Sequence, residues 1–598
     1  MTWDVADAPN RATLFARAFV DELAKAGVDA VCVAPGSRST PLTVALDDHP
    51  EIRVFSHLDE RSAAFFALGR GKRTGKPTPI VTTSGTATAN LHPAVMEADR
   101  GRVPLVVLTA DRPPELRDSG ANQTVDQEKL YGSAVRYYAD LPEPAAEGRK
   151  LRSLRTTAAR ALAETRGTKP GPVHLNFPFA KPLEPTDVPP DDPSGVPEDF
   201  AEEHPLAAVG RDGPFVSVTE GRAALADADA DRFADLVADA DRGLVVAGPM
   251  DAVDSAPAVA DLATASGFPL LADPLSGLRF GDHVADTPVV GGYDAYLDES
   301  VTREWPDPDL VLRFGASPTS KPLRKYLART GARQVVVDPT GEWREAEFRA
   351  TDLVTAEGES FARAVADRLD RETVTRTVDT WGPWARAESA HWDVVTDARG
   401  AEHFEGAVLS TVAETVPDPT TLFVSNSMPV RDVDRFAEPR VADVTALANR
   451  GASGIDGITS SALGAGSAAD GDESEETVLV TGDLAYYHDT NGLLALGRCD
   501  QEATIVLINN DGGGIFHMLP IEEFDAFERQ FKTPHGLDFA PTEDIYDLSF
   551  ARTDLDGFPD CFAEALDREG TTVVEVHTDA ERSHRTRERL KERVLDRL

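Results

Sequence analysis

Cysteine is almost absent from this sequence of 598 residues. Only Cys32, Cys499 and Cys561 occur, and none has the CxxC spacing of a thiolate metal site. So few cysteines exclude a disulfide framework and are typical of a reducing cytoplasm. Long hydrophobic runs are also lacking, since no stretch approaches the roughly 18 apolar residues of a membrane span. The N-terminus has no basic segment followed by an apolar one. We therefore expect a cytoplasmic protein with no membrane partner.

Basic residues are scarce as well. Lysine and arginine number 60 against 102 acidic residues, which gives a formal charge of −42. This balance excludes the broad basic footprint of a protein that binds nucleic acid. Hydrophobic residues make up 41% of the chain, a normal share for a folded protein, and apolar runs such as 31–34 and 505–508 argue against disorder. A densely carboxylated, hydrated surface favours solubility in salt, so we expect a halophilic source.

The chain is too long for one hydrophobic core, and its length predicts about three domains. Apolar strands alternate with helical segments throughout, which is typical of α/β domains built on parallel sheets. A run rich in proline and aspartate follows the first such series and predicts a linker, and an acidic stretch at 469–476 predicts a solvated loop. We assign the first domain, the linker, the central domain and the last domain to residues 1–185, 186–200, 201–375 and 376–598.

Two predicted strands, at 478–480 and 505–508, each end in polar residues. Asp483 follows the first strand and Asn510 follows the second, and the segment 491–498 between them has the composition of a crossover helix. A strand–helix–strand unit brings the carboxyl ends of its strands to the same edge of the sheet, where ligands bind. We therefore expect Asp483 and Asn510 to lie close together.

These two side chains suit a divalent metal. A carboxylate, an amide oxygen, the backbone carbonyl of the flexible Gly512 and diphosphate oxygens would satisfy the preference of Mg²⁺ for hard oxygen ligands. The spacing resembles the metal–diphosphate motif of thiamine-diphosphate enzymes, with Leu484 where a glycine is usual. The alternative is an ordinary strand–helix–strand unit whose Asp and Asn cap turns.

Five further motifs, combined with segment 483–516, point to one family. They are Pro35-Gly-Ser-Arg-Ser-Thr-Pro-Leu42, His57-Leu-Asp-Glu-Arg61, Ala110-Asp-Arg-Pro-Pro-Glu-Leu-Arg-Asp-Ser-Gly-Ala-Asn-Gln123, Ser425-Asn-Ser-Met-Pro-Val-Arg431 and Asn449-Arg-Gly-Ala-Ser-Gly-Ile-Asp456. With them the chain resembles the 2-succinyl-5-enolpyruvyl-6-hydroxy-3-cyclohexene-1-carboxylate synthases, the MenD family. The resemblance runs from about residue 11 to residue 520 and is weakest in the middle domain.

The resemblance implies three doubly wound parallel-sheet domains: a pyrimidine-binding, a central and a diphosphate-binding domain. It implies that 2-oxoglutarate is decarboxylated on thiamine diphosphate with Mg²⁺ (or Mn²⁺), and that the succinyl-semialdehyde unit is added to isochorismate in menaquinone biosynthesis. It also implies a homodimer or homotetramer with active sites between subunits, so that Glu60 and Asp483 of one site come from different chains.

The resemblance also implies roles for single residues. Glu60 is the carboxylate that activates the aminopyrimidine of the cofactor. The implied metal ligands are Asp483, Asn510 and Gly512. The implied cofactor contacts are Ser427, Ser453, Gly454, Ile455, Gly482, Leu484, Ala485, Ile515 and Phe516. The implied substrate contacts are Ser37, Arg38, Arg112, Asn122, Gln123, Lys321, Arg431, Arg450 and Leu519, whose arginines suit the carboxylates of both substrates.

Each of these residues has a plainer interpretation. An acid at a helix start, as Glu60 is, often caps the helix or meets its dipole. A single arginine often forms a surface ion pair, and Ile455 has the character of an ordinary core residue. The chain departs from the family pattern at Ala485, where serine is common, and at Pro322, where some members carry a basic residue.

Rival functions remain for the whole chain. Another thiamine-diphosphate carboligase, such as an acetolactate synthase-like enzyme, would react with pyruvate and lacks a need for the arginine motifs. A catalytically silent scaffold or a nucleotide-binding protein is a different class, but the acidic and amide residues are all present and no complete GxGxxG follows the central strands. We assign no catalytic role to His57, His92 or His517, since a lone histidine near a loop is more often structural.

Overall fold

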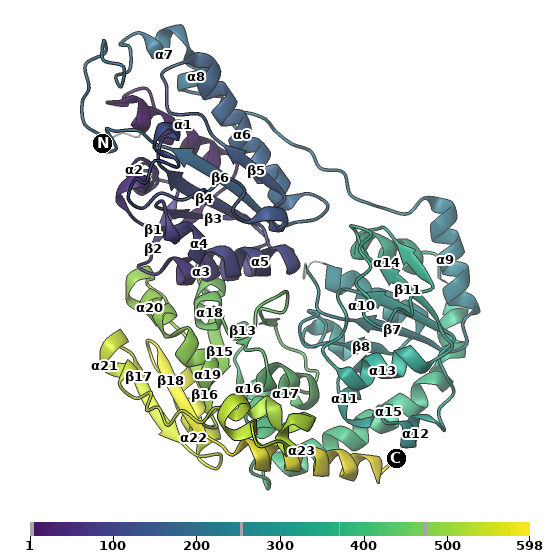
Figure 1. Cartoon of the computed structure of the whole chain (residues 1–598). Helices are drawn as coiled ribbons and strands as arrows, with labels where there is room; N and C mark the ends of the chain where they lie inside the picture. The colour runs from purple at the N-terminus through teal and green to yellow at the C-terminus, as the bar shows by residue number, and fades with distance from the viewer. Residues whose placement is uncertain (1–4, 252–254, 370, 470–474) are drawn as a thin grey trace. The chain divides into compact units, whose positions relative to one another are not determined.

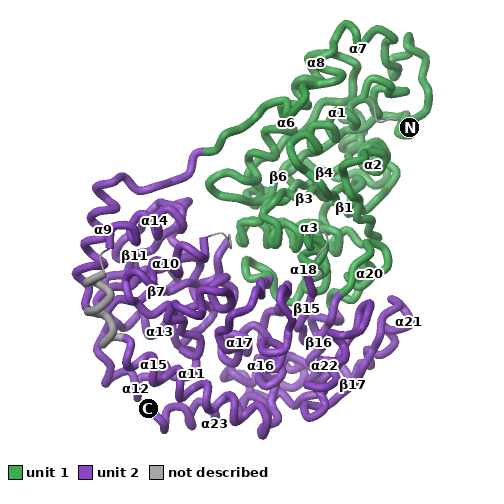
Figure 2. Tube along the Cα trace, turned by 180° about the vertical axis from the view of Figure 1, so that it is seen from behind, with its two compact units in different colours: residues 1–220, 449–470, 488–502 green, residues 221–448, 471–487, 503–598 purple. Residues whose placement is uncertain are grey.

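The computed structural model describes residues 5–251, 255–369, 371–469 and 475–598. The chain forms two compact units (Figure 2). Unit 1 comprises residues 1–220, 449–470 and 488–502, and unit 2 comprises residues 221–448, 471–487 and 503–598. Two short pieces from the C-terminal third of the chain therefore belong to unit 1. Of the expected acidic loop, residues 470–474 lie outside the described residues, and Glu476 begins a strand.

Three six-stranded sheets, with parallel pairing throughout, organise the described residues (Figure 1). The sheet of unit 1 has the order β2-β1-β3-β4-β6-β5, and those of unit 2 have the orders β12-β11-β10-β7-β8-β9 and β14-β13-β15-β16-β18-β17. In each sheet the chain starts at an inner strand, moves outward to one edge and then crosses to the other half of the sheet. This is the doubly wound pattern. The predicted fold class is confirmed.

The strands have the following bounds: β1 (Ala30–Ala34), β2 (Arg53–Ser56), β3 (Thr78–Thr82), β4 (Leu105–Asp111), β5 (Tyr137–Asp140), β6 (Pro172–Pro178), β7 (Gly243–Ala247), β8 (Leu270–Ala272), β9 (Val289–Val290), β10 (Leu310–Phe314), β11 (Arg333–Val337), β12 (Asp352–Val354), β13 (Thr420–Val424), β14 (Val444–Leu447), β15 (Glu476–Gly482), β16 (Thr504–Asn509), β17 (Ser549–Thr553) and β18 (Thr572–His577).

Unit 1 contains the helices α1 (Arg11–Lys25), α2 (Thr40–Asp47), α3 (Glu60–Thr74), α4 (Thr86–Asn90), α5 (His92–Arg100), α6 (Gly148–Arg166), α7 (Phe200–Glu203), α8 (Pro205–Ala208), α18 (Ile458–Gly466) and α20 (Leu494–Cys499). Unit 2 contains α9 (Asp227–Asp239), α10 (Ala256–Ser266), α11 (Tyr293–Tyr296), α12 (Glu299–Thr302), α13 (Lys321–Arg329), α14 (Gly358–Ala366), α15 (Arg371–Arg399), α16 (Glu405–Thr415), α17 (Met428–Phe436), α19 (Asp483–His488), α21 (Thr542–Tyr546), α22 (Phe558–Leu566) and α23 (Ala580–Leu595). None of the helices so described is long and apolar enough to cross a membrane.

The central strands are fully buried because helices cover both faces of each sheet. Every residue of β1, β3, β4, β7, β10, β13 and β16 is buried, which explains their continuous Val, Ile and Leu runs. The edge strands β5 and β17 are only partly buried and carry mixed residues, so their sequences gave no clear strand signal. The predicted crossover helix is a 3₁₀ turn, Thr490–Leu493, followed by α20. Helix α15 spans the expected boundary between residues 375 and 376.

Helices α3 and α18 of unit 1 pack with their backbones in close contact. A Cβ atom on Gly69 of α3 would lie 1.9 Å from the carbonyl oxygen of Ser461, and one on Gly464 of α18 would lie 2.0 Å from that of Phe66. Real Cβ atoms do not approach carbonyl oxygens so closely, so only glycine fits at these two positions. The contact ties the piece 449–470 to the first sheet's helices and explains its membership of unit 1.

Candidate active site

The ends of β15 and β16 bring the three expected metal ligands together in unit 2. The strands are parallel neighbours in a register that pairs Gly482 with Ile508, so the residues that follow them emerge side by side. Oδ2 of Asp483 accepts the backbone N–H of Asn510 at 3.2 Å and that of Gly512 at 2.9 Å. The expectation that the aspartate and the second asparagine lie close together is met by these contacts.

The two consecutive asparagines have different tasks. Asn509 ends β16 and uses its side chain internally: Nδ2 donates to Glu575 Oε1 at 2.8 Å, and Oδ1 accepts the N–H of Asp511 at 3.1 Å. Asn510 donates Nδ2 to Glu405 Oε1 at 2.8 Å, while its Oδ1 is buried and accepts no hydrogen bond from the described part of the chain. A buried amide oxygen without a donor is costly, and a cation would satisfy it.

Gly512 is required by its backbone. Its φ is 143°, and a Cβ atom would lie 2.0 Å from the carbonyl oxygen of Lys532. Its own carbonyl oxygen accepts the N–H of Gly514 at 3.1 Å. A carbonyl oxygen has a second lone pair, so this bond leaves it able to bind a metal ion. The donor set of carboxylate, amide and carbonyl oxygens therefore fits Mg²⁺ or Mn²⁺.

The charge of Asp483 also fits a metal. The side chain is 2% exposed, and burial raises the pKa of its carboxyl, against the hydrogen bonds from Gly512 and His535, which lower it. Among the described residues it forms no ion pair with lysine or arginine; its ionisable neighbour is His535, whose Nε2 lies 3.2 Å from Oδ2. Because Nδ1 of His535 accepts the N–H of Leu537 at 3.0 Å, the ring proton of the neutral tautomer sits on Nε2, facing the aspartate.

Glu405 and His535 are neighbours of this cluster that the sequence analysis did not find. Glu405 is the first residue of α16, and its Oε1 accepts Asn510 Nδ2 and Thr578 Oγ1. Burial raises the pKa of Glu405 to about 7; the hydrogen bond from Asn510 opposes this shift and the nearby Asp432 adds to it. Neither residue belongs to a short motif, so only the folded chain reveals them.

Ser427 has a strained backbone conformation between β13 and α17, in the same domain as the expected metal ligands. It precedes α17 with φ 72° and ψ −125°, a region that non-glycine residues rarely adopt, and such strain is found chiefly at functional sites. Arg431, one turn into α17, donates to the carbonyl oxygen of Ser427. Beyond β16, Ile515 and Phe516 lie in a partly buried 3₁₀ turn, and Leu519 is 45% exposed.

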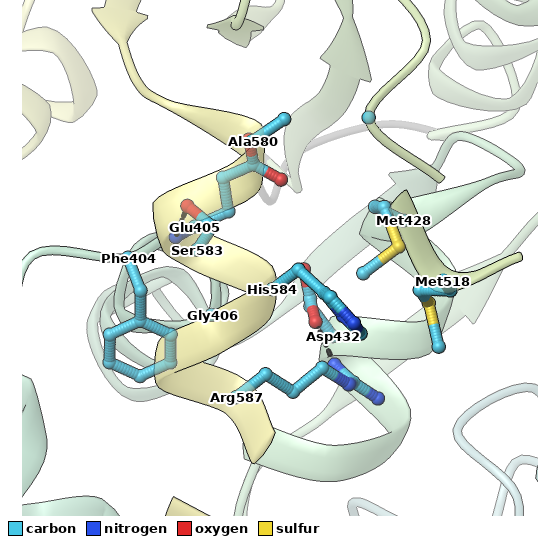
Figure 3. Close-up of a pocket in the computed structure, with 11 residues that line it drawn as sticks. Phe404, Glu405, Gly406, Met428, Asp432, Met518, Ala580, Ser583, His584 and Arg587 are labelled. Atoms are coloured by element: carbon cyan, nitrogen blue, oxygen red, sulfur yellow. Dashed lines mark hydrogen bonds and ion pairs between the residues drawn. The ribbon is translucent and has the colours of Figure 1, made fainter. Parts of the chain in front are cut away.

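A small cavity lies between α16, α17, α23 and the Gly514–Met518 turn (Figure 3). Its space, including the opening to solvent, is about 280 Å³. Met428 and Met518 lie on one side of it, and His584 and Arg587 of α23 line another, with Arg587 paired to Asp432. Glu405 and Asp432 line the same cavity.

Gly482, the last residue of β15, lies beside open space. A Cβ atom there would meet no atom of the chain within 4 Å, so its packing does not require glycine. Leu484 donates its backbone N–H to Asp483 Oδ1 at 2.6 Å, and Ala485 is buried. Open space at Gly482 and buried neighbours suit the close approach of a ligand rather than of protein.

Unit 1 holds Glu60. Asp59 is the N-cap of α3, accepting the N–H of Arg61 at 2.9 Å, so capping falls to Asp59 and Glu60 is the first helical residue. Oε2 of Glu60 accepts Asn90 Nδ2 at 3.2 Å, and the side chain is half-buried. The carboxylate is therefore oriented by a neutral amide.

The piece of chain that carries Arg450, Ser453, Gly454 and Ile455 is fixed by a buried carboxylate of the same unit. Glu97 accepts the backbone N–H groups of residues 451, 452 and 453 at 3.0, 2.6 and 2.9 Å. Ile455 is 36% exposed, and Gly454 and Arg450 are exposed too. Ile455 is thus not an ordinary core residue within unit 1.

The expected substrate residues of unit 1 gather at loops after its strands. Arg38 is buried, and burial together with the nearby Arg112 guanidinium lowers the pKa of its own guanidinium. Arg112 donates to the carbonyl oxygen of Asn122 at 2.9 Å, and Gln123, with φ 55°, donates to that of Ser84 at 3.0 Å. Two neighbouring arginines suit an anionic ligand. Ser37 is exposed at the start of the Ser37–Ser39 turn, and in unit 2 Lys321 is exposed at the start of α13.

Comparisons with known proteins agree with these features. Residues 14–130 match the N-terminal TPP-binding domain of thiamine pyrophosphate enzymes, residues 211–424 match the middle domain of thiamine pyrophosphate enzymes, and residues 444–576 match their C-terminal TPP-binding domain. The fold and these matches define a thiamine-diphosphate-dependent enzyme.

Proteins of similar sequence identify the family within this class of enzymes. A 2-succinyl-5-enolpyruvyl-6-hydroxy-3-cyclohexene-1-carboxylate synthase of Halobacterium salinarum is 64% identical over 98% of this chain and 99% of its own length. The synthase of Haloarcula marismortui is 61% identical over 99% of both chains, and that of Roseiflexus castenholzii is 45% identical over 96% of this chain and 97% of its own. The chain belongs to this synthase family, MenD.

Proposed function

We propose that the chain decarboxylates 2-oxoglutarate and joins the remaining succinyl-semialdehyde unit to isochorismate, which yields 2-succinyl-5-enolpyruvyl-6-hydroxy-3-cyclohexene-1-carboxylate and CO₂ in menaquinone biosynthesis. Family membership over almost the whole chain supports the reaction. The observation that carries the chemistry is the unpartnered, buried Oδ1 of Asn510 beside Asp483.

Thiamine diphosphate, when bound, supplies the electron sink for decarboxylation and carbon–carbon bond formation. The residues proposed to hold it and its Mg²⁺ or Mn²⁺ are those of the two strand ends, Asp483, Asn510 and Gly512, with Ser427, Ile515 and Phe516 nearby in the same unit. Leu484 and Ala485 follow Asp483, and the loop with Ser453, Gly454 and Ile455 completes the proposed contacts. Glu60 keeps a carboxylate available to the cofactor's aminopyrimidine ring.

The substrates are multiply anionic, so cationic side chains must bind and orient them. Arg38 and Arg112 already share one neighbourhood, and we assign the substrate carboxylates to them, to Arg431 and Arg450, and to Lys321. Ser37, Asn122, Gln123 and Leu519 are proposed to complete the substrate contacts. A homodimer or homotetramer with shared sites, a cytoplasmic location and a halophilic source complete the proposal, the last supported by the acidic composition and the haloarchaeal relatives.

One assay tests the function. CO₂ release and isochorismate loss are followed together at high salt with 2-oxoglutarate, Mg²⁺ and thiamine diphosphate, for the wild type, Glu60→Gln and the exposed control Glu51→Gln. We expect isochorismate-dependent turnover in the wild type and the control, and its collapse in Glu60→Gln. Turnover of pyruvate without isochorismate would favour an acetolactate synthase-like reaction instead.

A further inference from the structure

Glu405 is buried directly behind one of the proposed metal ligands. It is 3% exposed, opens α16 and lies beside Ser583 of α23, whose Oγ accepts its backbone N–H at 3.2 Å (Figure 3). Its Oε1 accepts two hydrogen bonds, from Asn510 Nδ2 at 2.8 Å and from Thr578 Oγ1 at 2.9 Å. Burying an acidic side chain costs free energy, so its burial at this position calls for a functional explanation.

The contact decides which way the amide of Asn510 faces. An amide has one end that donates and one that accepts, and the two ends are nearly equal in shape. When the carboxyl is charged, or carries its proton on the other oxygen, Glu405 Oε1 only accepts, and in the structure it accepts from Asn510 Nδ2 and from Thr578 Oγ1. The NH₂ end must therefore face Glu405, and the oxygen end must face away from it.

The oxygen end is the one with no partner. Asn510 Oδ1 is buried and accepts no hydrogen bond, while the backbone N–H of the same residue is held by Asp483 at 3.2 Å. If the amide were reversed, its NH₂ group would take the place of Oδ1 and would repel a cation there. The side chain is thus prepared in the one orientation that binds a metal ion.

Resting on the proposed function, we propose that Glu405 is a positioning residue that fixes the carbonyl oxygen of Asn510 toward the metal ion. Thr578 adds a second donor to the same oxygen and holds the carboxyl in place. Partners of this kind behind a metal ligand typically change metal affinity by about 10–100-fold.

The test is Mn²⁺ binding to the full-length protein with saturating thiamine diphosphate, measured from free Mn²⁺ by electron paramagnetic resonance. Glu405→Gln can present its own NH₂ group and so permits the reversed amide. We expect it to weaken Mn²⁺ binding by about tenfold or more. Glu414→Gln, on the exposed end of the same helix, is the matched control and should bind as the wild type does.

A second parent variant, Asn510→Asp, distinguishes loss of the positioning role from disturbed folding. Asn510→Asp presents a carboxylate with two equivalent oxygens, so orientation no longer matters, and Glu405 now faces a like charge. In that background Glu405→Gln should leave Mn²⁺ affinity unchanged or improve it.

The outcomes are distinct. Equal affinity of Glu405→Gln and the wild type overturns the positioning role and leaves the proposed function standing. An equal loss in both backgrounds also overturns it, since the effect then comes from disturbed folding, which melting curves of each variant check. A wild type that binds no Mn²⁺ overturns the metal site itself, and with it the proposed function.

Discussion

Two buried carboxylates, one in each unit, hold strand-end loops by the same means but differ in how their charge is met. Glu97 of unit 1 accepts three consecutive backbone N–H groups, those of residues 451–453. Asp483 of unit 2 also accepts three backbone N–H groups, from Leu484, Asn510 and Gly512. Glu97 is 0% exposed and Asp483 is 2% exposed, so burial does not separate them.

Their counter-charges do separate them. The ammonium of Lys72 lies 3.1 Å from Glu97, and although burial raises the pKa of Glu97, this lysine and the three N–H groups bring it below its ordinary value. Burial keeps the pKa of Asp483 raised, because its neighbour is a histidine rather than a lysine or arginine. A lysine neutralises Glu97, whereas Asp483 has no lysine or arginine partner among the described residues, which fits its proposed role as a metal ligand. We therefore expect replacement of the carboxylate by an amide to have different effects in the two units.

The largest effect is expected for Asp483→Asn. Loss of the carboxylate removes a proposed metal ligand, and a metal ion in such a site lowers the activation barrier by several kcal/mol, so kcat should fall by about 10³-fold or more. Turnover at saturating Mg²⁺ measures this, with Asp538→Asn, an exposed acid of the same unit, as control. Activity within tenfold of the wild type would contradict a metal role for Asp483.

Glu97→Gln should act on stability instead. It removes the ion pair with Lys72 and weakens the hydrogen bonds to residues 451–453, so we expect unit 1 to lose about 3 kcal/mol of unfolding free energy. Thermal or urea unfolding measures the loss against Glu164→Gln, a half-buried acid on α6. A variant as stable as the wild type would mean that the loop does not depend on this carboxylate.

Gly464→Ala probes the helix that follows this loop. The new Cβ would lie 2.0 Å from the carbonyl oxygen of Phe66, so α18 must shift, at a cost of about 1–3 kcal/mol. Gly497→Ala on α20 is the matched control. A Cβ atom there meets no atom within 4 Å, so this substitution should stabilise the helix slightly. Equal melting temperatures of the two variants would show that α3 and α18 do not pack as described.

The smallest effect concerns pH. Because the pKa of Glu97 is lowered in the folded protein, its contribution to stability is fully present above the ordinary glutamate pKa and is lost as the pH falls through the lower, folded value. Between about pH 5 and pH 3 the wild type should therefore lose more stability than Glu97→Gln. Melting curves across this range check the sign, and parallel curves would refute it.

Much of this arrangement is readable from the sequence, since it depends on local pattern. The apolar runs of β15 and β16 and the polar residues after them placed Asp483 and Asn510 together. The family motifs identified the chemistry. The choice between Asn509 and Asn510 rests on where each side chain points, which the spacing alone does not determine.

What the sequence does not reveal depends on contacts between distant segments. Glu405 faces Asn510 only because α16 packs beside the end of β16, and Glu97 meets residues 451–453 only because α18 packs on α3. The edge strands β14 and β17 lack a continuous apolar run, because half-buried strands have mixed composition. No short motif signals such pairs.

The most direct test is the rise in melting temperature on adding Mn²⁺ with thiamine diphosphate, compared among the wild type, Glu97→Gln and Asp483→Asn. Binding to the folded state stabilises it by mass action. We expect a rise for the wild type and for Glu97→Gln, the latter from a lower starting temperature, and no rise for Asp483→Asn. A full rise in Asp483→Asn would contradict the claim that this carboxylate is reserved for the metal.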